Sequence, residues 1–90
     1  MLLTNIPIRA TGTWMNVDGY VIIKNEIHKV ILNKRQSYLW NKIDGNKNIG
    51  ELIEELSESN NVDKELLLNF IANALEIRII YFYKNEWEVN

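Results

Sequence analysis

The sequence predicts an α+β fold, with a small N-terminal antiparallel sheet of about three strands, then three helices and a short C-terminal hairpin. A repeated spacing indicates the first two helices: Asn33 precedes Gln36 by three residues, and Asn48 precedes Glu51 by three. In each pair the Asn side chain can accept a hydrogen bond from a free backbone N–H of the first turn, and the Gln or Glu side chain can accept one from the N–H of the cap. Asp18-Gly19, a strong hairpin signal ahead of a β-branched, apolar run, indicates the sheet.

Three strands are expected before the first helix. The turn at Val17-Asp18-Gly19 joins the first two, and a two-residue loop at Asn25-Glu26 joins the second and the third. Residues 1–13 form a loosely patterned arm that we expect to be mobile, and Pro7 lies within it. The expected strands are about Thr11–Asn16, Tyr20–Lys24 and Ile27–Leu32.

The two-residue loop predicts a register for the second and third strands. It places Val21 opposite Val30, Ile23 opposite His28, Ile22 opposite Lys29 and Tyr20 opposite Ile31. Side chains alternate between the two faces, so a one-residue slip would exchange the faces. The better candidate for the core face contains Val21, Ile23, His28, Val30 and Leu32, and the opposite face contains Tyr20, Ile22, Lys24, Ile27, Lys29 and Ile31.

The three helices are expected at about Lys34–Asp44, Ile49–Ser57 and Lys64–Ile77. Asp44-Gly45 ends the first helix, since Gly tolerates the left-handed conformation found at many helix ends, and Asp63 is a suitable cap for the third. The apolar stripe of the third helix is formed by Leu67, Phe70, Ile71, Ala74 and Leu75. A closing hairpin is expected from Ile79–Tyr83 and Trp87–Val89 around Lys84-Asn85, which makes the architecture winged-helix-like.

Composition argues against an enzyme. The 90 residues make one domain, without cysteine and therefore without disulfides or thiolate chemistry, and they contain one histidine and no Gly-rich phosphate loop. His28 is predicted as a packed strand residue, and Glu51, Glu54, Glu55 and Glu58 as a solvated acidic helix face. We expect no cofactor and no metal. The Met1-Leu2-Leu3 start is too short for an export signal, so a cytoplasmic location is expected.

Short apolar motifs follow one another in a specific order between Leu32 and Ile80. They are Leu32-Asn33, Leu39-Trp40, Ile43, Asp44-Gly45, Ile49, Leu52-Ile53, Phe70-Ile71, Leu75 and Ile79-Ile80. This order resembles the PqqD-like family of small peptide chaperones, also called precursor-peptide recognition elements, which serve ribosomally made, enzymatically modified peptides. The resemblance covers about Tyr20 to Ile80. Arg78 stands where the family usually has a glycine at the end of the third helix. The resemblance therefore does not predict the backbone geometry by which the chain leaves that helix.

The resemblance implies a stand-alone, non-catalytic protein that binds the leader of a precursor peptide and presents it to a modifying enzyme. In the family that enzyme is commonly a radical-SAM enzyme, or a leader protease in lasso-peptide pathways. The leader adds to the third strand as an antiparallel strand, with side chains in a cleft against the third helix. The matching positions here are Ile27, His28, Lys29, Val30, Ile31, Leu66, Leu67, Phe70, Asn73, Ala74 and Ile77. Lys24, Lys29, Lys34 and Arg35 would help to orient an acidic leader.

Two other classes of function remain open, a winged-helix DNA-binding regulator and a plain oligomerisation module. The third helix and its flanks carry three acidic residues, Asp63, Glu65 and Glu76, against Lys64 and Arg78. Phosphate contacts supply most non-specific DNA affinity, so this surface does not favour DNA. We therefore expect neither nucleic acid nor membrane as a partner, and either a monomer or a strand-swapped dimer.

Overall fold

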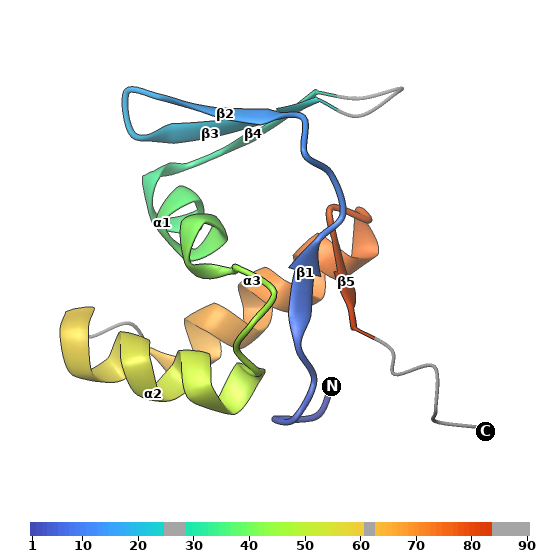
Figure 1. Ribbon diagram of the computed structural model, residues 1–90. Coiled ribbons are helices and arrows are strands. Elements are labelled where there is room, and N and C mark those ends of the chain that lie inside the picture. Colours follow the sequence, from blue (N-terminus) through green and yellow to red (C-terminus); the bar gives the residue numbers. More distant parts are fainter. Residues whose placement is uncertain (25–28, 61–62, 84–90) are drawn as a thin grey trace.

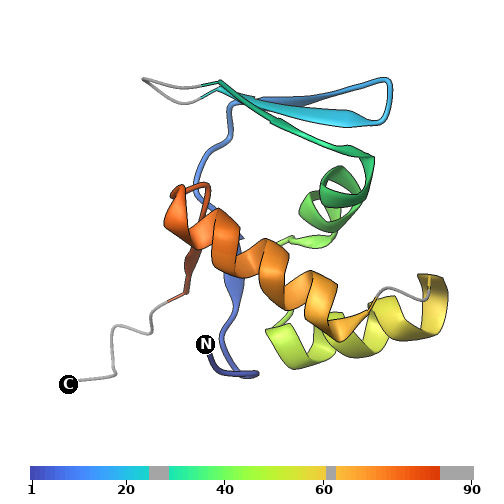
Figure 2. The same ribbon diagram turned by 180° about the vertical axis from the view of Figure 1, so that it is seen from behind.

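The computed structural model describes residues 1–24, 29–60 and 63–83, apart from the side chains of residues 59 and 60. It confirms the α+β class, because two antiparallel sheets accompany three helices. The three-stranded sheet lies at one end of the molecule, with the helices on one side of it (Figures 1 and 2). The elements are β1 (Pro7–Arg9), β2 (Trp14–Val17), β3 (Tyr20–Lys24), β4 (Lys29–Leu32), α1 (Lys34–Lys42), α2 (Ile49–Asn60), α3 (Lys64–Glu76) and β5 (Ile80–Phe82).

The β2–β3 hairpin has the predicted turn. Val17 pairs with Tyr20, and both residues between them have positive φ, 51° at Asp18 and 86° at Gly19. This conformation matches the twist of the two strands, and it is favoured by Asp-Gly. The strand itself starts at Trp14, later than the expected Thr11. The loop predicted at residues 25–26 lies outside the described residues.

β3 and β4 pair in a register that differs from the predicted one by two residues. Val21 lies opposite Leu32, and Ile23 lies opposite Val30. Because side chains alternate with a period of two, this shift leaves each residue on its predicted face. Val21, Ile23 and Leu32 are buried accordingly. The predicted pairs that are wrong are Val21 with Val30, Ile22 with Lys29, and Tyr20 with Ile31; the predicted partner of Ile23, His28, lies outside the described residues.

The N-terminal arm, which the sequence analysis expected to be mobile, is hydrogen-bonded to the body of the protein. β1 pairs antiparallel with β5, so that Pro7 lies opposite Phe82. Further along, the carbonyls of Asn5 and Leu3 accept the N–H groups of Ile49 and Gly50, at 3.0 and 2.9 Å. These two N–H groups belong to the first turn of α2, where no intrahelical partner exists. The arm therefore supplies hydrogen-bond acceptors to the first turn of α2, and it also contributes one strand of the β1–β5 sheet.

The helix starts are the predicted ones. Asn33 and Gln36 form a reciprocal capping box at α1, and Asn48 and Glu51 form the same pair of bonds at α2. The side chain of Asp63 caps α3. The ends differ by a few residues from the expected ones, since α1 ends at Lys42, α2 continues to Asn60 and α3 ends at Glu76.

The exit from α3 forms without a glycine at its left-handed position. Arg78 has a φ of 63°, in the left-handed region. Its N–H donates to the carbonyl of Leu75 at 3.1 Å, and the N–H of Ile79 donates to the carbonyl of Ala74 at 3.0 Å. These two bonds make a Schellman motif with an arginine at the left-handed position. The chain then enters β5, the first strand of the predicted hairpin, whereas Trp87–Val89 lie outside the described residues.

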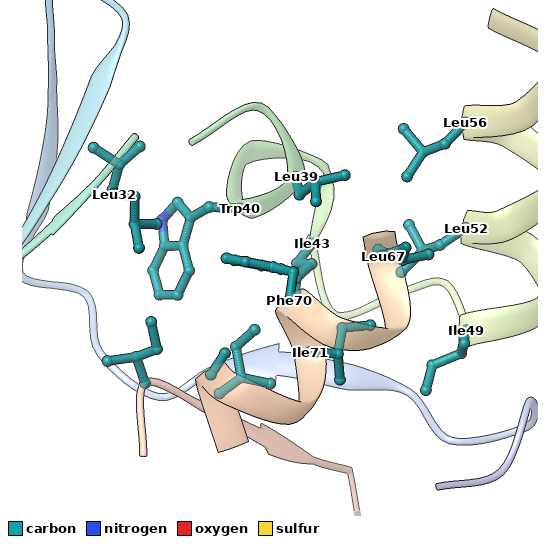
Figure 3. Packing of buried hydrophobic residues seen from close by; sticks show 14 of the residues in the cluster. Leu32, Leu39, Trp40, Ile43, Ile49, Leu52, Leu56, Leu67, Phe70 and Ile71 are labelled. Carbon is teal, nitrogen blue, oxygen red and sulfur yellow. The ribbon is translucent and has the colours of Figure 1, made fainter. Parts of the chain in front are cut away.

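One hydrophobic core joins the three-stranded sheet to the helices. Trp40 of α1 and Phe70 of α3 both point into this core (Figure 3), with exposures of 0% and 6%. Trp14 meets Trp40 edge to face at 5.9 Å between ring centroids, and the guanidinium of Arg9 lies 4.8 Å from the Trp14 ring. The remaining stripe residues of α3, Leu67, Ile71 and Ala74, are buried as predicted, and Leu75 is half-buried.

Among the described residues, no helix combines the length and apolar character needed to cross a membrane.

Candidate functional site

β4 is an edge strand of the three-stranded sheet. The strand order is β2-β3-β4, so within the described part of the chain β4 pairs with β3 on one side and with no strand on the other. Both views show this edge beside α1 and running into it (Figures 1 and 2). An unpaired edge presents N–H and C=O groups to any further strand. The strand that the sequence analysis assigned to peptide binding therefore has the position that strand addition requires.

The hydrogen bonds around β3 show which residues of β4 point to the free edge. The N–H of Lys24 donates to the carbonyl of Thr13, on the β2 side. Val21 precedes Lys24 by three residues, and its N–H points to the other side of β3. There it donates to Ser37 Oγ at 2.7 Å, beside Leu32. In a strand the main-chain groups alternate in direction, so Val21 and Ile23 face β4.

Their partners in β4 therefore face back toward β3. These partners are Leu32 and Val30, since each lies directly opposite Val21 or Ile23. The main-chain N–H and C=O groups of the alternate residues, Lys29 and Ile31, consequently point to the free edge. The structure thus selects Lys29 and Ile31 as the residues whose main-chain groups are available to an added strand.

The outer face of the same sheet is apolar and uncovered. Met15, Ile22 and Ile31 lie in one cross-strand row, and Met15 and Ile31 are 59% and 60% exposed. No described element lies over this face (Figures 1 and 2). Val17 and Tyr20 form the next row and are also exposed. The result is a continuous apolar surface that ends at the free edge of β4.

Lysines stand at both ends of this apolar surface. Lys24 and Lys29 lie directly opposite each other, a like-charged pair that is mildly unfavourable in a sheet. They line a groove of about 470 Å³ together with Met15, Ile22 and residues 12–14. At the other end the ammonium of Lys34 lies 5.8 Å from the centre of the Tyr20 ring. Among the described residues, neither Lys24 nor Lys29 forms an ion pair.

The helix residues predicted for binding fall into two groups. Leu67, Phe70 and Ala74 are buried in the core, with exposures of 1%, 6% and 2%. Asn73 and Ile77 are exposed, and Leu66 is half-buried. The exposed residues lie off the main apolar stripe, as the sequence indicated. Of the helix residues predicted for binding, Leu66, Asn73 and Ile77 are therefore the ones whose side chains a ligand can reach.

α1 contacts both β4 and α3, the two elements expected to enclose the leader-binding cleft. α1 packs on β3 and β4, and α3 packs on α1, α2 and β5. The first turn of α3, which contains Leu66, lies beside α2 and away from the sheet, whereas its last turn lies nearer to the sheet (Figures 1 and 2). Of the predicted strand residues, Val30 is half-buried and packs against the core, Lys29 and Ile31 are exposed, and Ile27 and His28 lie outside the described residues.

Ser37 holds the end of β4 in place, a role that the sequence analysis did not identify. Its hydroxyl accepts from the N–H of Val21 at 2.7 Å and donates to the carbonyl of Leu32 at 3.1 Å. Ser37 is 2% exposed. The hydroxyl bridges the two strands at their last pair and ties both to α1. A signal was present in the sequence, because a serine three residues before Trp40 falls on the apolar side of an amphipathic helix.

Reactive chemistry is sparse in the described part of the chain. The described residues contain no group of three or more acidic, His or Cys side chains that could hold a metal ion. The side-chain hydrogen bond to Glu55 raises the pKa of Lys47 above 10.5, and the nearby carboxylates act in the same direction, against burial. This pair lies between the start of α2 and its middle, away from β4.

Two further grooves lie elsewhere. The larger, about 780 Å³, is lined by Ala10, the end of α3 and β5 through Tyr83. Its lining ends at the last described residue, so we assign no ligand to it. The second, about 390 Å³, places Arg9 and Trp14 near Asp44. Arg9 already stacks on Trp14, so this groove is explained by packing.

Comparison of the chain with known protein families, with curated proteins and with solved structures finds no match in any of the three.

Proposed function

We propose that this chain is a non-catalytic recognition protein that binds the leader of a ribosomally made precursor peptide by strand addition to β4. The observation that carries the proposal is the free edge of β4, where Lys29 and Ile31 direct their main-chain groups away from the sheet. An added strand gains affinity from main-chain hydrogen bonds, and it gains specificity from alternate side chains. The resemblance to the PqqD-like family supports the same mode of binding.

The benefit of such binding is proximity. A leader held on this small domain, with a modifying enzyme bound to the domain as well, is brought to the enzyme at a high effective concentration. The modification then becomes nearly intramolecular, without any reactive group on this chain. The partner class that the family resemblance favours is a radical-SAM enzyme or a leader protease.

The proposal predicts a short reading frame beside the gene of this chain, and its test is a titration with the leader that such a frame encodes. We expect saturable binding at physiological salt, and none to a duplex DNA of random sequence, because α3 and its flanks carry three acidic and two basic residues. Absence of such a reading frame, or DNA binding in place of peptide binding, would contradict the proposal.

Proline variants locate the binding surface. Proline has no N–H, so Lys29→Pro removes a donor from the free edge, whereas Val30→Pro removes one that faces β3. We expect Lys29→Pro to lose the leader while keeping a cooperative melt, and Val30→Pro to lose the fold. Leader binding that survives Lys29→Pro would place the site elsewhere.

A further inference from the structure

We infer that β4 selects a peptide in which an apolar residue is followed, two positions later, by an acidic residue. This inference rests on the proposed function and specifies its ligand. It follows from the position of Ile31 and Lys29, which are separated by one residue and direct both their main-chain groups to the free edge and their side chains to the outer face.

The register of an added antiparallel strand fixes the order of the two ligand residues. Side chains directly opposite each other in neighbouring strands lie on the same face, about 4.5–5.5 Å apart between Cβ atoms. The ligand residue opposite Ile31 comes first along the peptide, and the one opposite Lys29 comes two residues later. A parallel strand would present the same two residues in the reverse order.

The first ligand position is apolar because it extends an existing row. Met15, Ile22 and Ile31 already form three neighbouring positions of that row, and Ile31 at its end is 60% exposed. An apolar side chain beside Ile31 would cover part of that surface and remove it from water. A polar side chain there would leave Ile31 exposed.

The second ligand position is acidic because it relieves a repulsion. Lys24 and Lys29 are directly opposite like charges, and among the described residues no carboxylate pairs with either. A ligand carboxylate beside Lys29 would offset this repulsion. A second copy of this chain does not fit the same surface, since lysines stand at both ends of the apolar face and would meet lysines.

A displayed library tests the pattern without knowledge of the natural leader. Randomised ten-residue peptides on yeast are sorted for binding to the labelled protein, and the enriched sequences are aligned. We expect an aliphatic or aromatic residue followed two positions later by Asp or Glu, and a synthetic peptide of this kind should bind up to about five-fold more tightly than its Lys-for-Asp analogue. The peptide with the two residues in reverse order should bind more weakly, and a preference for it would overturn the antiparallel register.

Two variants with matched controls connect the pattern to the named residues. Lys29→Glu should reverse the preference at the second position from acidic to basic. The same change at Lys64, the first residue of α3, which lies away from the sheet, should leave that preference unchanged. Ile31→Thr should weaken the apolar preference at the first position, whereas Met15→Thr, on the far strand of the same row, should not. Binders that lack the spaced pair, or an acidic preference that survives Lys29→Glu, would overturn the inference while strand addition stands. A library without any binder would overturn both.

Discussion

Removal of the Ser37 hydroxyl should destabilise the protein far more than removal of a solvent-exposed hydroxyl would. The hydroxyl makes two buried hydrogen bonds, from the N–H of Val21 and to the carbonyl of Leu32. Each bond contributes about 0.5–1.5 kcal/mol, and a buried N–H left without a partner costs about 1–3 kcal/mol. We therefore expect Ser37→Ala to lower the free energy of unfolding by about 2–4 kcal/mol. For a domain of this size, that change lowers Tm by roughly 10–25 °C.

The assay is urea and thermal unfolding followed by circular dichroism, with two comparison variants. Ser37→Cys keeps the volume but provides a poor hydrogen-bond donor and acceptor, so it should lose nearly as much stability as Ser37→Ala. Ser57→Ala, on an exposed position of α2, should stay within about 0.5 kcal/mol of the parent. Amide exchange at Val21 should accelerate in Ser37→Ala. A variant as stable as the parent, with Val21 still protected, would refute the bridging role.

Three further predictions concern the core, a helix end and a surface ion pair. Trp40→Ala or Phe70→Ala should cost about 3–5 kcal/mol and leave the chain largely unfolded, because so small a domain has little stability to lose; a cooperative melt within a few degrees of the parent would contradict this. Arg78→Gly should stabilise the protein by about 0.5–1 kcal/mol, since glycine adopts positive φ without strain, and an unchanged or lower urea midpoint would count against it. The bond to Glu55 raises the pKa of Lys47. The contribution of this ion pair to stability is therefore complete below pH 10.5 and is lost as pH rises through the raised pKa. The stability difference between the parent and Lys47→Met should accordingly be constant near neutral pH and shrink at the alkaline end of a pH series; a difference that grows there would show the opposite sign.

Local signals in the sequence predicted the helix starts and the hairpin turn. The bonds between Asn33 and Gln36, and the positive φ at Asp18 and Gly19, depend on residues within a few positions of each other. Such interactions involve only neighbouring residues, so the sequence alone is enough to predict them. The faces of the sheet were predicted for a related reason, because apolar alternation distinguishes the two faces.

Alternation cannot distinguish registers that differ by two residues, and for this reason the pairing of Val21 with Val30 was predicted wrongly. The β1–β5 pairing was also missed. Its two strands are three residues each and lie at opposite ends of the described chain, so no local pattern connects Pro7 to Phe82. The direction of the main-chain groups in β4 likewise depended on contacts of Val21 and Lys24 that only the folded chain provides.

The central claim is that an added peptide strand bonds to the main chain of Lys29 and Ile31. Amide exchange measured by NMR, on ¹⁵N-labelled protein with and without saturating leader, tests it at each residue. The N–H groups of Lys29 and Ile31 should gain protection on binding, while those of Val30 and Leu32, which face β3, should change little. Saturable peptide binding that leaves Lys29 and Ile31 freely exchanging, and protects another surface, would contradict strand addition at β4.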